Sequence, residues 1–110
     1  MAEKKSSLVI NGQTYPLDDL PDAITMALRK PVVIGDQTYD VLELREPLAG
    51  EFQKFTKIAA TDPAGALIIL IASVTGIAEP IIKKIGVRDM NLASTYLTGF
   101  MQGDQQTEMS

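Results

Sequence analysis

The sequence contains no cysteine, no histidine and no tryptophan among its 110 residues. Without cysteine no disulfide can form, and this fits a protein that works in a reducing cytoplasm. The absence of cysteine and histidine also removes the usual zinc ligands, the thiol nucleophile and the side chain that most often transfers protons near neutral pH. We therefore expect neither a zinc centre nor a thiol- or histidine-based catalytic site.

Basic residues are also scarce: ten Lys and Arg stand against 14 Asp and Glu, so the net charge is −4. Nucleic-acid binding needs Lys and Arg to displace phosphate counterions, so we expect no nucleic-acid partner. The apolar run Ala66–Val74 is shorter than the ~20 residues that cross a bilayer, and residues 1–7 are not followed by a signal-peptide pattern. We expect a soluble protein without a membrane partner.

Two segments of the sequence resemble each other. Residues 9–15 and 33–39 match at five of seven positions, and in each a two-residue turn separates an apolar pair from Gln-Thr-Tyr. Asn11-Gly12 suits a type I′ turn and Gly35-Asp36 a type II′ turn, because these turns need positive φ at those glycines and at Asn11. They predict two β-hairpins, Leu8–Leu17 and a second one about Gly35-Asp36. The second would pair Ile34 with Gln37, Val33 with Thr38 and Val32 with Tyr39.

Residues 23–31, before the second turn, allow two interpretations. Ile24, Met26 and Leu28 alternate with polar or small residues, which favours a strand, although Ile24 and Leu28 also suit one face of a helix. After Val41 the apolar positions change phase, to Leu42 and Leu44. Either a β-bulge near residues 40–42 returns them to the buried face, or the strand is buried on both faces.

From Pro47 onward the pattern is helical. Glu46 and Pro47 favour one helix start, and Asp62 with Pro63 favours a second helix that ends at Gly76. Residues 78–85 form a short amphipathic turn closed by Gly86, and Asp89 begins a last helix. Strands therefore precede helices, which predicts the α+β class: N-terminal antiparallel hairpins in a small sheet, then a bundle of three to four short helices.

The predicted organisation is one domain over residues 8–101, with hairpins at 8–46 and helices at 47–101. Residues 1–7 are predicted to be disordered, and residues 102–110 to form a flexible tail.

Four residue groups could suggest a catalytic, metal or DNA-binding site, and each has a simpler explanation. Residues 18–22 (DDLPD) match the spacing of a magnesium-binding motif, but Pro21 spoils the required helical turn. Lys83 and Lys84 before Gly86 weakly resemble a DNA-binding hairpin, but the second glycine of that hairpin is absent and the chain is acidic. A solvated lysine pair near a helix C-terminus, where positive charge favours the helix dipole, is the simpler explanation. The third group consists of serines without a histidine base, and Ser73 among them should bond to its own backbone (Ser6, Ser7, Ser73, Ser94). The fourth group consists of acids around Arg45 that suit a surface network (Glu43, Glu46, Glu51). We predict no enzyme activity and no cofactor.

The helical half carries more apolar side chains than two hairpins would cover. Ile68–Ile71 and a stripe from Leu92 to Met101 are either a buried core or an exposed surface that binds a partner or a second copy of the chain. On the second interpretation the predicted partner-binding residues are Ile81, Ile82, Ile85, Leu92, Tyr96, Leu97, Phe100 and Met101.

Residues 28–52 (LRKPVVIGDQTYDVLELREPLAGEF) resemble the small tail assembly chaperones of Mu-like, long-tailed bacteriophages. The similarity covers about residues 23–101. It is carried by an apolar strand with Lys-Pro, a turn, a Tyr-containing strand, and Leu-Arg-Glu-Pro before an acid. Those positions are Leu28, Lys30, Pro31, Gly35, Asp36, Tyr39, Leu42, Leu44, Arg45, Glu46, Pro47, Ala49, Gly50 and Glu51, followed downstream by Thr75, Gly76, Asp89 and Phe100.

The resemblance implies an assembly function. Such proteins bind the long, helical tape measure protein, keep it soluble and help tail tube subunits polymerise around it. They act in the host cytoplasm as late proteins and are generally absent from the finished virion, and many also exist as a longer frameshifted product. The implied partners are the tape measure protein, the tail tube protein and a second copy of the chain. The rival hypothesis is a structural virion component, such as a tail completion or minor tail protein. The first hairpin, Leu8–Leu17, lies outside the resemblance.

Overall fold

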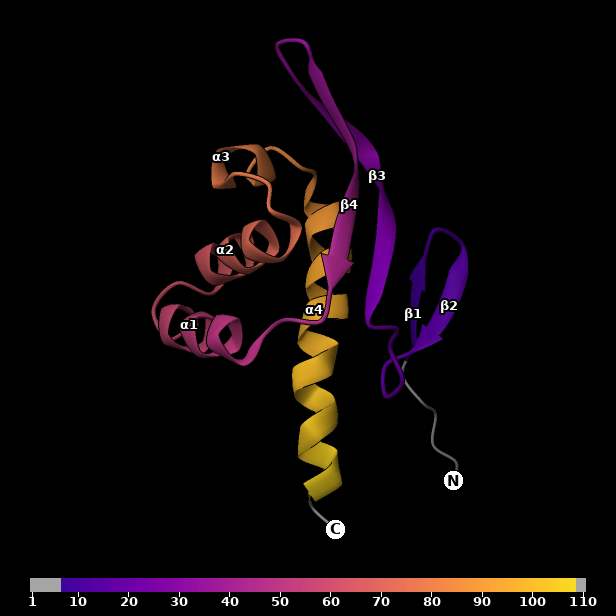
Figure 1. Cartoon of the computed structure of the whole chain (residues 1–110), viewed down its shortest axis with the longest axis vertical. Helices are drawn as coiled ribbons and strands as arrows, with labels where there is room; N and C mark the ends of the chain where they lie inside the picture. The colour runs from indigo at the N-terminus through magenta and orange to yellow at the C-terminus, as the bar shows by residue number, and fades with distance from the viewer. Residues whose placement is uncertain (1–6, 109–110) are drawn as a thin grey trace.

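The computed structural model describes the backbone of residues 7–108 and the side chains of residues 7–101. Two antiparallel hairpins come first and four helices follow, which confirms the α+β class (Figure 1). Of the segment predicted to be disordered, residues 1–6 lie outside the described part and Ser7 begins the first strand. The last helix continues to Glu108, so the predicted tail begins as helix, and its flexibility stays a prediction.

The first hairpin forms as its turn residues require. Strands β1 (Ser7–Ile10) and β2 (Gln13–Pro16) are joined by Asn11 and Gly12, whose φ angles of 55° and 81° confirm the type I′ turn. Leu8 and Ile10 point into the core, while Val9 between them is exposed.

The side chain of Asn11 fastens this hairpin to the second one. Its Nδ2 donates to the carbonyl of Thr25 at 2.8 Å, and its Oδ1 accepts from the amide of Ala27 at 2.9 Å. Thr25 and Ala27 belong to the strand that begins the other hairpin, and the two hairpins share no backbone ladder. One amide side chain therefore provides the donor and acceptor that a neighbouring strand would otherwise supply.

The second hairpin is long. Strand β3 (Ala23–Ile34) pairs with β4 (Gln37–Arg45), so the strand interpretation of residues 23–31 is confirmed, as are the three predicted pairs next to the turn. Gly35 has a φ of 59° at the first turn position, as a type II′ turn requires. The tip of this hairpin stands clear of the rest of the molecule (Figure 1).

The predicted irregularity is present, but the extra residues belong to the other strand. Ala27 pairs with Val41 and Val32 pairs with Tyr39, so residues 28–31 of β3 lie opposite Asp40 alone. The excess of three residues is odd, and an odd excess exchanges the two faces of β4. Leu42 and Leu44 consequently face the core, and Val41 is 38% exposed, so β4 is not buried on both faces.

A buried carboxylate occupies this bulge. Asp89 lies in the first turn of α4 (Val87–Glu108) and is 1% exposed. Its two oxygens accept from the backbone amide of Arg29 at 3.0 Å each, and Oδ2 also accepts from that of Lys30 at 3.2 Å. Asp89 was predicted to begin the last helix, but α4 begins two residues earlier, at Val87. The Asp89 side chain instead accepts from strand amides that the bulge leaves without ladder partners.

The two helices after the hairpins have the expected cap chemistry with one shift. Helix α1 (Ala49–Ala59) begins two residues after Pro47, because the Glu51 carboxylate accepts from the Leu48 amide at 2.8 Å and so makes Leu48 the cap. Helix α2 (Pro63–Thr75) begins after Asp62, which accepts from the Gly65 amide at 3.0 Å.

The remaining helix ends and the short helix also agree with the sequence. Helix α2 ends at Gly76, with φ of 75°, and α3 (Glu79–Ile82) forms the predicted short turn.

The core lies between the hairpins and the helices. Helix α2 is central: it packs against α1, α3, α4 and β4, and it buries Ala66, Leu70, Ile71 and Val74. Helix α4 runs along the strands and buries Tyr96, whose hydroxyl donates to the carbonyl of Pro21 at 2.7 Å. A Cβ on Gly99 would lie 2.7 Å from Leu20 Cδ1, so the 17–22 connection rests directly on α4.

Candidate partner-binding surface

Helix α1 is a surface helix of the fold. It packs closely on α2 alone among the described elements, and none of its residues is buried. On one flank Leu48 is 64% exposed and Phe52 is 43% exposed. Burial of apolar side chains is the main source of folding free energy, so two exposed large ones a single helical turn apart form a candidate contact surface.

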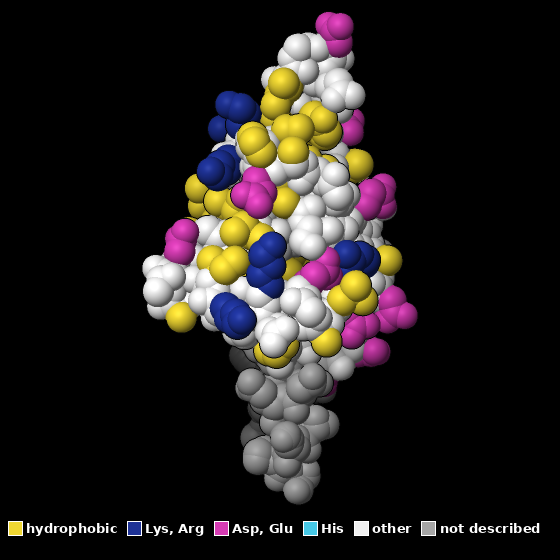
Figure 2. All heavy atoms as spheres, turned by 60° about the vertical axis from the view of Figure 1, so that its left-hand side comes forward, with side chains coloured by type: hydrophobic (Ala, Val, Ile, Leu, Met, Phe, Trp, Pro, Cys, Tyr) yellow, Lys and Arg dark blue, Asp and Glu magenta, His cyan; other side chains and the backbone are white. Residues whose placement is uncertain are grey.

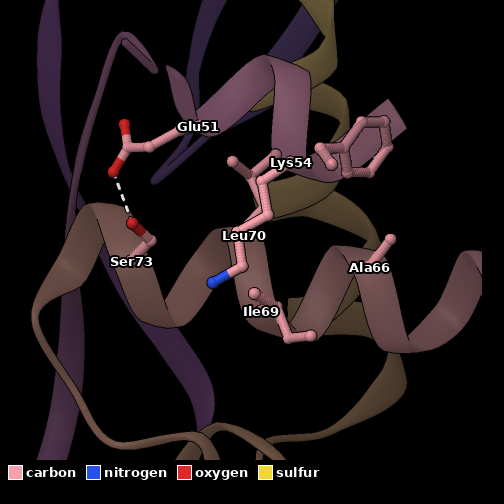
Figure 3. Close-up of a pocket in the computed structure, with 7 residues that line it drawn as sticks. Glu51, Lys54, Ala66, Ile69, Leu70 and Ser73 are labelled. Atoms are coloured by element: carbon pink, nitrogen blue, oxygen red, sulfur yellow. Dashed lines mark hydrogen bonds between the residues drawn. The ribbon is translucent and has the colours of Figure 1, made fainter. Parts of the chain in front are cut away.

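Where α1 meets α2, the two helices border a shallow hollow, which we call the α1–α2 groove. Phe55 from α1 and Ala66, Ile69 and Leu70 from α2 supply its apolar lining. Its polar edge consists of Glu51, Lys54 and Ser73, and Figure 3 shows the Lys54 side chain extending from α1 toward α2. The hollow measures about 220 Å³ with the solvent at its mouth included, so it is a shallow surface depression and not an enclosed ligand cavity.

The acid at the edge of the groove is already neutralised. Arg45 donates to both oxygens of Glu51, at 2.8 and 2.9 Å, and the Ser73 hydroxyl also donates to this carboxylate (Figure 3). These bonds, first of all the one from Arg45, lower the pKa of Glu51 to about 2, and the same pairing raises the pKa of Arg45. A ligand in the groove therefore meets Lys54 as the uncompensated charge of its edge.

This arrangement confirms one prediction and corrects another. Arg45 and Glu51 form the expected network at the junction of strand and helix, although Glu43 instead accepts from the Thr25 hydroxyl. Ser73 was predicted to bond to its own backbone. It donates to Glu51 instead, because α1 brings that carboxylate within reach of α2.

Charge is unevenly distributed between the two halves. Residues 7–46 hold seven acidic and three basic residues, whereas residues 47–101 hold four acidic and five basic ones. Figure 2 shows Lys and Arg mainly over the helical side, with Asp and Glu concentrated along the strand side. Among the described residues, none of the five basic side chains of the helical half forms an ion pair. Residues 47–101 thus carry a small excess of positive charge in a chain whose net charge is −4.

The residues predicted to bind a partner divide into two groups. Ile82, Ile85, Tyr96 and Leu97 are buried in the core, so a partner could contact them only after α3 or α4 moved. Ile81, Leu92, Phe100 and Met101 are partly buried and pack against that core, and Phe100 meets Tyr96 edge to face at 5.2 Å between ring centroids.

Sequence reasoning did not place α1 among the binding elements. Its signal was the stripe of Phe52 and Phe55 on one helix face, which is equally typical of a helix that is covered by a sheet.

Two other kinds of site find no support in the part of the chain that the structure describes. The aspartates of residues 18–22 do not join any cluster of three or more side chains that could hold a metal ion. None of the described helices is both long enough and apolar enough to cross a membrane.

Comparison with known proteins adds a family to this description. Residues 25–102, more than two thirds of the chain, match the family model described as phage tail assembly chaperone proteins, E, or 41 or 14. No curated protein and no solved structure gives a significant match. The match begins within β3 and ends within α4, so the β1–β2 hairpin lies outside it, as the sequence resemblance predicted. The chain therefore belongs to the phage tail assembly chaperone family.

Proposed function

We propose that this protein binds the tape measure protein of its phage, keeps it soluble before the tail forms, and assists assembly of the tail tube around it. The observation that carries the proposal is the exposed apolar flank of α1, where Leu48 and Phe52 are uncovered in a member of an assembly chaperone family. A long helical protein exposes apolar stripes until its own partners arrive, and an apolar helix face on a small acidic protein can cover such stripes.

The proposal includes where and how the protein acts. It works in the host cytoplasm late in infection, catalyses no reaction, needs no cofactor and leaves before the virion is complete. The contacts come from the helical half: Leu48 and Phe52 first, with the partly buried Ile81, Leu92, Phe100 and Met101 as a second line of contact. The tail tube protein and a second copy of the chain are further partners under this proposal.

Co-expression with the tape measure protein of the same phage tests the binding. The wild-type chain should raise the soluble fraction of the tape measure protein and co-purify with it. The double variant Leu48→Ser/Phe52→Ser should lose most of this effect. Val33→Ser is the matched control, because Val33 is 66% exposed but lies on the hairpin tip, and it should behave as wild type. An insoluble tape measure protein beside a folded wild-type chain would refute the proposal.

Mass spectrometry of purified virions tests the second half of the proposal. A chaperone should be missing from the particles, at a detection limit of less than one copy per virion. A stoichiometric presence would instead assign the chain to the structural components of the tail, such as a tail completion or minor tail protein.

A further inference from the structure

We infer that the α1–α2 groove recognises an amphipathic helix that lays its apolar face across the groove and carries acidic residues beside that face. The inference rests on the proposed function, since it names the partner chemistry for the same helical surface. It adds the α1–α2 groove as a second contact region beside the exposed Leu48 and Phe52.

The shape of the groove indicates the kind of partner. It is shallow, has Phe55, Ile69 and Leu70 in its lining, and lies open between two packed helices. The surface of a packed helix pair has ridges and grooves formed by side chains. A third helix can pack on it, because its own side chains form ridges at a spacing of three to four residues. A flat small molecule would find too little enclosed volume here.

Charge indicates the flanking residues of that partner. Lys54 lies on the edge of the groove, and Lys57, one turn further along α1, lies on the same side of the helix. Both side chains are exposed, and neither forms an ion pair within the described part of the chain. The acid on the edge of the groove, Glu51, is held by Arg45 and Ser73, so it forms no ion pair with either lysine. Carboxylates on the partner would meet these two lysines, whereas a basic helix would be repelled.

Two synthetic helical peptides provide the direct test. Both carry leucine at positions spaced by four and three residues on one face; one has glutamates on either side of that face and the other has lysines at the same positions. Fluorescence anisotropy should show the wild-type chain binding the glutamate peptide at least tenfold more tightly than the lysine peptide. Raising the salt concentration should narrow this ratio, because exposed charges are screened.

Charge reversal at the groove gives the decisive comparison. Lys54→Glu/Lys57→Glu should bind the glutamate peptide at least tenfold more weakly than wild type and should prefer the lysine peptide. Lys83→Glu/Lys84→Glu is the control with the same change of net charge, since these residues flank α3 and do not line the groove. It should keep the wild-type preference. Circular dichroism confirms that all variants are folded.

Several outcomes would overturn the inference. Binding of the glutamate peptide that is equal in the two reversal variants would show a general charge effect. Absence of binding by the wild type at millimolar peptide would show that the groove is not a helix site. Self-association that disappears in Lys54→Glu/Lys57→Glu, measured by light scattering, would assign the groove to a second copy of the chain.

The two proposals can fail separately. If the wild-type chain keeps the tape measure protein soluble but ignores both peptides, the inference fails and the function stands. If the glutamate peptide binds as expected while the tape measure protein stays insoluble, the groove is a helix site but the proposed function fails.

Discussion

The contact between α4 and the β3 bulge offers the sharpest test of how this fold is held together. Asp89→Ala removes the carboxylate that accepts from the amides of Arg29 and Lys30. Hydrogen bonds to a charged group contribute a net ~1.5–3 kcal/mol each, and two amide donors lose their acceptor. Because Arg29 and Lys30 lie at the surface, water replaces part of this loss. We expect the free energy of unfolding to fall by about 2–4 kcal/mol.

Urea denaturation measures this change. For a domain of this size the dependence of the unfolding free energy on urea is ~1–3 kcal/mol per M, so the midpoint should fall by roughly 1–2 M with an unchanged slope. Asp89→Asn keeps one acceptor oxygen and should lose about half as much. Hydrogen exchange should show faster exchange of the Arg29 and Lys30 amides in both variants.

The control for lost charge is Asp40→Ala, an exposed aspartate opposite the same bulge. A surface substitution of this kind should change stability by no more than ~0.5 kcal/mol. The reasoning is refuted if Asp89→Ala is no more destabilising than Asp40→Ala, because the buried carboxylate would then not be satisfying the bulge amides.

Three further predictions follow from individual contacts. The pKa of Glu51 is lowered from 4.5 to about 2, so its contribution to stability is complete above pH 4.5 and is lost as the pH falls from 4.5 toward 2. When the unfolding free energy is measured against pH, Glu51→Gln should lack this loss of stability. Burial, first of all, raises the pKa of Tyr96 from 10 to about 12, so absorbance at alkaline pH should show an ionisation near pH 12 that Tyr96→Phe removes, and stability should fall as the pH rises from 10 to 12. Asn11→Gly keeps the turn but removes two hydrogen bonds to β3, so unfolding free energy should fall by about 1–2 kcal/mol; Asn11→Ala should lose about 1 kcal/mol more, since alanine is strained at a φ of 55°. Equal losses in the two Asn11 variants would contradict the last prediction.

Local signals in the sequence were sufficient where a short segment specifies its own conformation. Asn11 and Gly12 dictate one hairpin turn and Gly35 the other, because few residues tolerate positive φ. Asp62 and Gly76 mark both ends of α2 by ordinary cap chemistry. Alternation of apolar residues from Ile24 identified β3, and the same chemistry gave the order of strands and helices.

Contacts between distant segments were beyond the reach of this reasoning. The bulge was predicted on β4 and lies on β3, since its position depends on Asp89, a residue 59 or 60 positions away from the amides that it accepts from. Helix α1 was predicted to begin at Pro47 but begins at Ala49, because the Glu51 carboxylate accepts from the Leu48 amide. Ser73 was predicted to bond to its own backbone, but it donates to Glu51, 22 residues earlier, because α1 packs against α2.

The candidate site shows the same division. An apolar stripe on α4 and an apolar stripe on α1 look alike in sequence, because both have the spacing of a helix face. Tertiary packing buries Tyr96 and Leu97 and leaves Leu48 and Phe52 exposed. By itself, then, the sequence determined the α+β order, the turns and the family resemblance, all of which depend on residues close together in the chain. Only the tertiary structure decided which apolar face is covered and which charges are neutralised, because burial and ion pairing depend on the segments that meet in space.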